Sequence, residues 1–226
     1  MSNTDSFISE VTEEVRRDKL YSKFRKYGWI GVVAIVAIVA SAGYREWSIS
    51  NDRAAAEALG DAMFEALAAD DAGLGASKLV SLNADSAGAK AIVGLIAASR
   101  FVEAGDRQSA LDELGKVADN AEIPAVYRDL ARLHSVAIQG RSLEPDERLA
   151  LLEPLSAQGE PYSVLAMEQS AYALIDRGDR ERAAELFEEI LAADIPPTMA
   201  RRIQNILIAL GRNPIAGDLG GSGASN

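Results

Sequence analysis

The sequence predicts an all-α protein with a single transmembrane helix, and three observations carry this prediction. Residues 27–44 contain no charged side chain and lie between Lys26 and Arg45. Beyond them, apolar residues recur about every 3.6 positions, as in helices, in alanine-rich segments separated by Gly, Asp or Pro. The pattern of residues 92–124 returns in residues 165–197. No run of alternating β-branched residues indicates a sheet.

The uncharged stretch reads YGWIGVVAIVAIVASAGY and is 18 residues long. As a helix it extends about 27 Å, close to the roughly 30 Å apolar core of a bilayer, and its aromatic ends suit the membrane interface. It predicts a transmembrane helix over residues 27–44. The alternative is a helix buried in a soluble core, but such a helix has no reason to carry basic residues at both ends.

The basic residues around this stretch are unevenly distributed. Residues 1–26 contain six Lys or Arg side chains, whereas the first twenty residues after the span contain only Arg45 and Arg53. Because basic flanks resist translocation, the N-terminus is predicted to stay in the cytoplasm and the rest of the chain to lie outside. Cleavage after the small residues 39–43 is the alternative, although secretory signals usually have a shorter charged start.

Composition excludes several classes of function. The chain carries a formal net charge of -11, and because residues 1–26 hold six basic and five acidic side chains, the remainder holds 17 and 29, a net charge of about -12. Such an acidic surface repels nucleic acid. The chain has no Cys, which excludes disulfides, thiolate metal sites and thiol catalysis.

The sequence predicts no enzyme, no cofactor and no metal site. His134 is the only histidine, so a cluster of several histidines is impossible and any Ser-His-Asp triad would need this residue. We expect His134 to be packed or solvated within its helix. No Gly-rich phosphate loop follows a strand. An envelope hydrolase is the alternative, but it needs an acid and a base that the sequence does not display.

Residues 4–26 are predicted to form an amphipathic cytoplasmic helix. Apolar residues recur there every three to four positions, among them Phe7, Ile8, Val11 and Val15. Either the membrane surface or a partner's cytoplasmic helix would cover this stripe. A solvated helix that frays is the alternative.

The chain beyond the span is predicted to form helical pairs. The helix after the span either continues to residue 69 or breaks near residues 48–51. A first unit is predicted over residues 52–85, with its second helix at 74–82. An intervening unit is predicted to contain helices 125–139 and 146–157, and a last helix is predicted over 200–210. Pro154 is predicted to kink or end its helix. Residues 212–226 are predicted to be a disordered tail.

The two matching segments align without a gap at an offset of 73 residues. The aligned pairs include Gly105 with Gly178, Asp106 with Asp179, Ala110 with Ala183, Leu114 with Phe187, and Pro124 with Pro197. One ordinary and one lengthened unit of 34 residues would fill this offset.

This arrangement resembles the tetratricopeptide repeat, a helix–turn–helix unit of about 34 residues. The resemblance implies that Ala98 and Ala171 face Ala110 and Ala183 where the two helices of a unit cross. It also implies that Gly105 and Gly178 form the turns, and that Leu114 and Phe187 fill the contact with the next unit. Two positions depart from the pattern in both copies. The position that is usually tryptophan holds Gly94 in the first copy and Met167 in the second. The last position that is usually a small residue holds Val117 and Ile190. Residues 45–211 are thus expected to form a tetratricopeptide-like solenoid, with generic stacking of helical hairpins as the alternative.

The anchor and the repeats together resemble the ancillary Sec translocon subunits, bacterial inner-membrane proteins with one span and a periplasmic tetratricopeptide-like domain. The opening SFISEVTEEVRRDKLYSKFRKYGWIGVVAIVAIVA is most similar to alphaproteobacterial members. The resemblance implies Sec translocon subunits and a membrane-anchored periplasmic chaperone as partners, and a role in protein export. A scaffold in cell-wall synthesis, division or respiratory-complex assembly is the alternative, since it would share every feature.

First helices of successive tetratricopeptide units line a concave surface, where we expect a protein partner to bind. The predicted partner-binding residues are Ser99, Glu103, Arg128, Arg132, Glu168, Tyr172 and Asp176. Of these, Arg128 and Arg132 belong to the surface if Ala131 is the small residue of the intervening unit. The alternating charges and single aromatic ring of the whole set suit a polypeptide better than a small molecule, which usually needs an enclosed pocket. Alternatively, these are solvated helix residues and the span recognises the partners.

Overall fold

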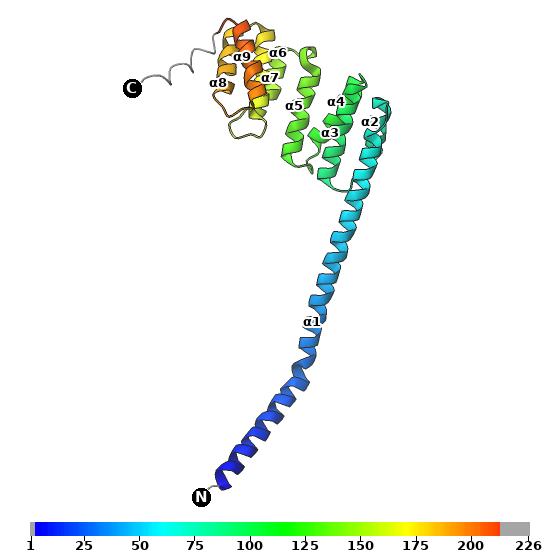
Figure 1. Ribbon diagram of the computed structural model, residues 1–226, viewed down its shortest axis with the longest axis vertical. Coiled ribbons are helices and arrows are strands. Elements are labelled where there is room, and N and C mark those ends of the chain that lie inside the picture. Colours follow the sequence, from blue (N-terminus) through cyan, green and yellow to red (C-terminus); the bar gives the residue numbers. More distant parts are fainter. Residues whose placement is uncertain (1–2, 213–226) are drawn as a thin grey trace, which may run out of the picture. The chain divides into compact units, whose positions relative to one another are not determined.

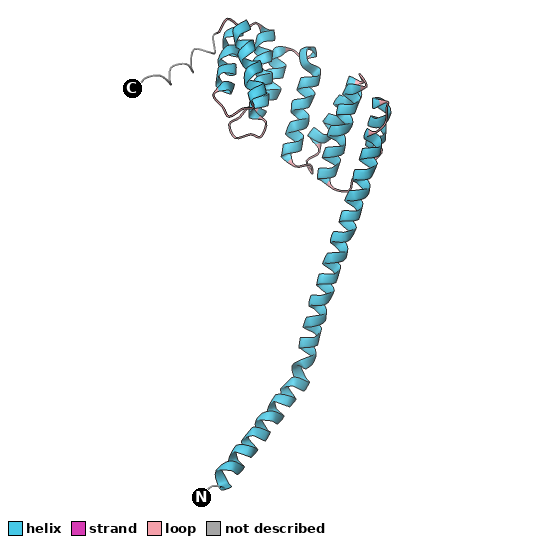
Figure 2. Ribbon diagram, viewed as in Figure 1, coloured by secondary structure: helices cyan, strands magenta, loops and turns pink. Residues whose placement is uncertain are grey.

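A computed structural model gives the backbone of residues 3–212 and the side chains of residues 29, 33 and 35–212 (Figure 1). Secondary structure in this part of the chain is helical throughout, with nine α-helices, two 3-10 helices and no strand (Figure 2). The predicted all-α class is therefore confirmed. The chain divides into two units, residues 1–58 and residues 59–226.

The first unit consists of most of helix α1 (Asn3–Leu67), which ends in the second unit. The helix continues through residues 48–51, in agreement with the absence of proline and the abundance of good helix formers in the longer segment 45–69. Large apolar side chains are exposed along it, namely Trp29, Val33, Ile35, Val36, Ile38, Val39, Tyr44, Trp47 and Ile49. The amphipathic stripe predicted over residues 4–26 lies outside the described side chains.

Among the described residues, no helix combines the length and the apolar character needed to cross a membrane. The transmembrane helix predicted over residues 27–44 is thus not found there. Residues 27, 28, 30–32 and 34 of that stretch lie outside the described side chains. The predicted tail also falls outside the description from residue 213 onward.

The second unit is a succession of helical hairpins. Its elements are α2 (Ala72–Val80), α3 (Ala87–Glu103), α4 (Arg107–Asp119), α5 (Ala125–Gln139), η1 (Gly140–Ser142), α6 (Pro145–Leu152), η2 (Glu153–Leu155), α7 (Ser163–Arg177), α8 (Arg180–Leu191) and α9 (Pro197–Ala209). Consecutive helices pack on one another from α2 to α5 and again from α6 to α8 (Figure 1). This order is that of stacked helical pairs.

Most helix boundaries follow the sequence prediction. Helix α5 covers the predicted residues 125–139, and α2 begins two residues before the predicted 74, because the Asp71 carboxylate accepts a hydrogen bond from the backbone N–H of Leu74. The helix predicted over 146–157 does not reach residue 157, but it is interrupted at Pro154 as predicted: α6 stops at Leu152, and Pro154 lies in η2. Proline has no N–H for the helical hydrogen bond and clashes with the preceding turn.

The Gly-Asp pairs of the repeat build the two matching turns. Gly105 and Gly178 have φ angles of 77° and 92°, in the left-handed region that favours glycine. After each glycine, an aspartate caps the next helix: the carboxylates of Asp106 and Asp179 accept hydrogen bonds from backbone N–H groups three residues on. The predicted turn positions are confirmed.

The predicted contact positions lie in the core. Ala98, Ala110, Ala171 and Ala183 are at most 1% exposed, so the helices of each pair approach closely. Leu114 and Phe187 are fully buried, each in its own apolar cluster. The register of the repeat is therefore confirmed over both helical pairs.

The final proline pair is out of register by one residue. Pro124 is the N-cap of α5, but the N-cap of α9 is Pro196, not Pro197. Ile123 and Ile195, the residues before these prolines, pack into their respective clusters. The second copy is thus one residue shorter in this loop, and the offset from α5 to α9 is 72.

The two departures from the repeat pattern compensate for each other in the first copy. Gly94 and Val117 are both buried, and a Cβ atom on Gly94 would lie 2.7 Å from Cγ2 of Val117. The branched side chain of Val117 therefore occupies the space that Gly94 leaves free. One small residue is still present at this crossing, but on the other helix.

We expect Gly94→Ala to destabilise the fold by about 1 kcal/mol, because overpacking of roughly 1–3 kcal/mol exceeds the gain in helix propensity of about 1 kcal/mol. In a Val117→Ala background the clash is absent, and Gly94→Ala should become stabilising. Urea unfolding of the full chain in mild detergent, with both single variants and the double variant, measures this reversal. An effect of the same sign in both backgrounds would contradict the described contact.

Candidate partner-binding surface

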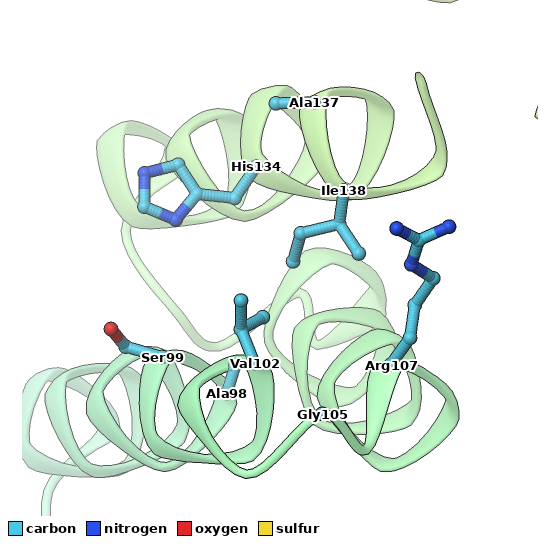
Figure 3. Close-up of a pocket in the computed structure, with 8 residues that line it drawn as sticks. All are labelled: Ala98, Ser99, Val102, Gly105, Arg107, His134, Ala137 and Ile138. Carbon is cyan, nitrogen blue, oxygen red and sulfur yellow. The ribbon is translucent and has the colours of Figure 1, made fainter. Parts of the chain in front are cut away.

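A hollow of about 530 Å³ lies between the α3–α4 pair and α5. We call it the α3–α5 groove. It is lined by Ala98, Ser99, Val102, Gly105, Arg107, His134, Ala137 and Ile138. Figure 3 shows these residues as sticks.

The lining changes character along the groove. At one end Ser99 of α3 and His134 of α5 face each other, in the middle Val102 faces Ile138, and Arg107 lies beside Ile138 at the other end (Figure 3). The lining residues include no carboxylate. Partial burial lowers the pKa of His134, so at neutral pH its ring is a neutral hydrogen-bonding group. The groove thus offers a polar end, an apolar middle and a cationic end.

The repeat register positions these side chains. Ser99 follows the crossing residue Ala98, and the turn at Gly105 brings Arg107 to the start of α4. On α5 the buried Ala131 is three residues before His134 and seven before Ile138, spacings that share one helix face. The crossing of the helices therefore decides which side chains line the groove.

The predicted residues of α3 and α5 have different environments. Ser99 is exposed and lines the α3–α5 groove, whereas the Glu103 carboxylate pairs with Arg100 at 2.7 Å. Arg132 pairs with Asp129 at 2.7 Å and donates a hydrogen bond to the carbonyl of Ala118. Arg128 is half-buried. Of these four residues, only Ser99 is in the groove lining.

Two predicted residues of α7 form an internal network with α9. The Glu168 side chain is only 5% exposed and accepts two hydrogen bonds of 2.9 Å from Arg202. The hydroxyl of Tyr172 donates to the same carboxylate, and its ring packs edge-on against Phe187. Glu168 is thus buried in an ion pair and is not presented to solvent, contrary to the expectation for a concave-surface residue.

Residues 22–211 match the family described as tetratricopeptide repeat-like domain. The chain belongs to this family. Its members typically bind protein partners. The comparisons found no match among curated proteins or solved structures.

In this tetratricopeptide repeat-like domain, Asp176 also has internal partners. Its carboxylate accepts hydrogen bonds from Arg148 at 2.7 Å and from Arg141 at 3.0 Å. The hydrogen bond from Arg148 is the largest influence on Asp176 and lowers the pKa of its carboxyl; burial opposes this, and Arg141 lowers the pKa further. Since Arg148 is only 6% exposed, Asp176 neutralises a buried cation.

We expect Asp176→Asn to cost about 1–2 kcal/mol at neutral pH, because Arg148 loses a charged hydrogen-bond partner. The lowered pKa means that the folded state favours ionised Asp176. Its stabilisation is present above the unfolded-state pKa of about 3.9 and is lost as pH falls through the lower folded-state value. Urea unfolding at neutral pH and near pH ~3 should show the gap between wild type and variant closing in acid. A constant gap would rule out this linkage.

Sequence reasoning missed Arg107, His134 and Ile138 as residues of one groove. The available signal was the position of the buried Ala131, because the residues three and seven places after it lie on the same face of the helix. Arg148 and Arg202 carried no such signal, since each lies about 30 residues from its carboxylate partner. In the described residues, no group of three His, Cys, Asp or Glu side chains is placed to hold a metal ion.

Proposed function

We propose that this protein is a membrane-anchored interaction module of bacterial protein export, an accessory subunit of the Sec translocon that works with a membrane-anchored periplasmic chaperone. The proposal includes no enzymatic role. The observation that carries it is the combination of a tetratricopeptide repeat-like domain with a preceding helix whose large apolar side chains are exposed.

The exposed side chains of α1 support an anchor in the bilayer. Ile35, Val36, Ile38 and Val39 are each at least 60% exposed. Successive residues of a helix are turned by about 100°, so these four side chains together with the exposed Val33 and Tyr44 span roughly two thirds of the circumference of α1, more than a single neighbouring helix could cover. A bilayer surrounds a helix completely, which makes it the better cover.

The flanking charges support an orientation with the N-terminus in the cytoplasm and the repeats in the periplasm. Six basic residues precede residue 27, and only two follow within the first twenty positions after residue 44. The resemblance of the opening sequence to ancillary translocon subunits favours export over other envelope processes. A scaffold for cell-wall synthesis, division or respiratory-complex assembly is the second candidate.

Copurification of the full chain in mild detergent distinguishes these candidates. We expect translocon subunits and a periplasmic chaperone to copurify with the wild type. A variant in which residues 27–44 are exchanged for an unrelated span is the matched control, because it loses any partner that is recognised within the membrane. Recovery of division, cell-wall or respiratory proteins in place of translocon subunits would reject the export role.

Protease treatment of spheroplasts tests the topology. We expect digestion of the chain after Arg45 and protection of residues 1–26, because only the repeats are predicted to lie outside. A tag at each end identifies the surviving fragment. Release of a soluble protein beginning near Ala42 would reject the anchor.

A further inference from the structure

We propose that the α3–α5 groove binds an extended segment of a partner polypeptide in which an apolar side chain is followed by an aspartate or glutamate. This inference rests on the proposed role as an interaction module and names the chemistry of the partner. It is based on the charges at the groove, on its apolar middle, and on a comparison with the second copy of the repeat.

Among the described side chains, Arg107 is a cation without an ion-pair partner. None of the ion pairs in the described part of the chain includes Arg107. The neighbouring carboxylates are engaged elsewhere: Glu103 holds Arg100, and Asp106 accepts hydrogen bonds from the backbone N–H and the hydroxyl of Ser109. In a strongly acidic domain, this groove therefore offers a place for a carboxylate.

The middle of the groove provides apolar surface beside this cation. Val102 is 45% exposed, and Ile138, half-buried, faces it from α5. An apolar side chain placed between them would cover surface that is now in water. At the far end, the Ser99 hydroxyl and the neutral His134 ring can each bond to the amide groups of an extended backbone. These three features lie in a row, which suits a chain segment.

The second copy of the repeat has larger or more apolar side chains at the corresponding positions. The residues that correspond to Ser99 and Val102 are Tyr172 and Ile175, and those that correspond to His134 and Ile138 are Ile206 and Leu210. All four pack against the apolar cluster around Phe187. In the first copy a smaller residue, Ser99, and a more polar residue, His134, stand at two of these positions and line the groove. The variant Ser99→Tyr therefore places in the groove the side chain that stands at this position in the second copy.

Peptide binding to the full chain in mild detergent tests the proposal. The probes are fluorescent octapeptides, acetylated and amidated, with a central leucine followed by glutamate; control probes carry glutamine in place of glutamate or alanine in place of leucine. We expect each control peptide to bind about tenfold more weakly in fluorescence polarisation, as for a lost charged hydrogen bond or a lost apolar contact. Equal binding of all three peptides would overturn the proposal.

Two protein variants assign this binding to the groove. Arg107→Gln should remove the preference for glutamate over glutamine, while Arg180→Gln, the matched change in the second copy, should leave it intact. Ser99→Tyr should weaken the leucine-glutamate peptide about tenfold or more, with far-UV circular dichroism as the check on folding. Unchanged binding by Arg107→Gln or by folded Ser99→Tyr would overturn the proposal, and Arg107→Gln alone decides if Ser99→Tyr does not fold.

The outcomes separate this inference from the proposed function. If translocon subunits copurify but the protein binds all three peptides equally, the export role is kept and peptide binding at the α3–α5 groove is rejected. If the protein prefers the leucine-glutamate peptide but no translocon subunits copurify, peptide binding at the α3–α5 groove is kept and the export role is rejected.

Discussion

Replacement of Phe187 by alanine is expected to lower the free energy of unfolding by about 3–5 kcal/mol. The Phe187 side chain is fully buried and packs with residues of α7 and α9, including Ala171, Ile203 and Leu207. Its removal leaves a cavity where three helices meet, and these helices have no way to close it without shifting. Urea unfolding of the full chain in mild detergent, followed by circular dichroism, measures the loss.

Phe64→Ala is the matched control, because Phe64 belongs to the same unit but is 74% exposed. We expect it to change stability by less than about 0.5 kcal/mol. Since each repeat contacts mainly its neighbours, Phe187→Ala should also leave peptide binding at the α3–α5 groove unchanged while the chain is folded. Equal costs for the two phenylalanine variants would contradict the described packing of α8.

Arg202→Ala is expected to cost about 3 kcal/mol, the lower end of the range for breaking a buried ion pair. Arg202 is the only cation paired with Glu168 in the described residues, and without it a carboxylate that is 5% exposed loses its counter-charge. The Arg202 side chain is itself 52% exposed, so water can replace part of its contribution. We expect the lost stability to appear in urea unfolding of the full chain in mild detergent.

Glu168→Leu should cost no more than about 1 kcal/mol, because exposed Arg202 can return to water and Leu95 occupies the corresponding position of the first copy. Glu168→Leu in combination with Arg202→Ala should then cost less than Arg202→Ala alone. Additive losses would show that Glu168 is not the buried charge that Arg202 compensates. The variant Glu168→Lys would place a second positive charge beside Arg202 in a buried position, so it tests folding and not partner binding.

The sequence alone determined the helices and the register of the repeat. Small residues such as Ala98 and Ala110, a glycine at each turn and a large apolar residue such as Phe187 recur at fixed spacings, and these contacts form between helices that are adjacent along the chain. Local spacing is sufficient to predict such contacts, since it decides which residues share a helix face. The predicted orientation of the span over residues 27–44 rests on the sequence alone.

Only the tertiary structure decided which residues of the predicted concave surface are available to a partner. Glu168 and Asp176 have the same spacing on α7 as Leu95 and Glu103 on α3, but their carboxylates are held by Arg202 and Arg148, 34 and 28 residues away. Helical periodicity says nothing about partners at such distances, because their meeting depends on how α6, α7 and α9 cross. The α3–α5 groove is open for a related reason: Ser99 and His134 come from different helices, and their shared space exists only after α5 packs on α4.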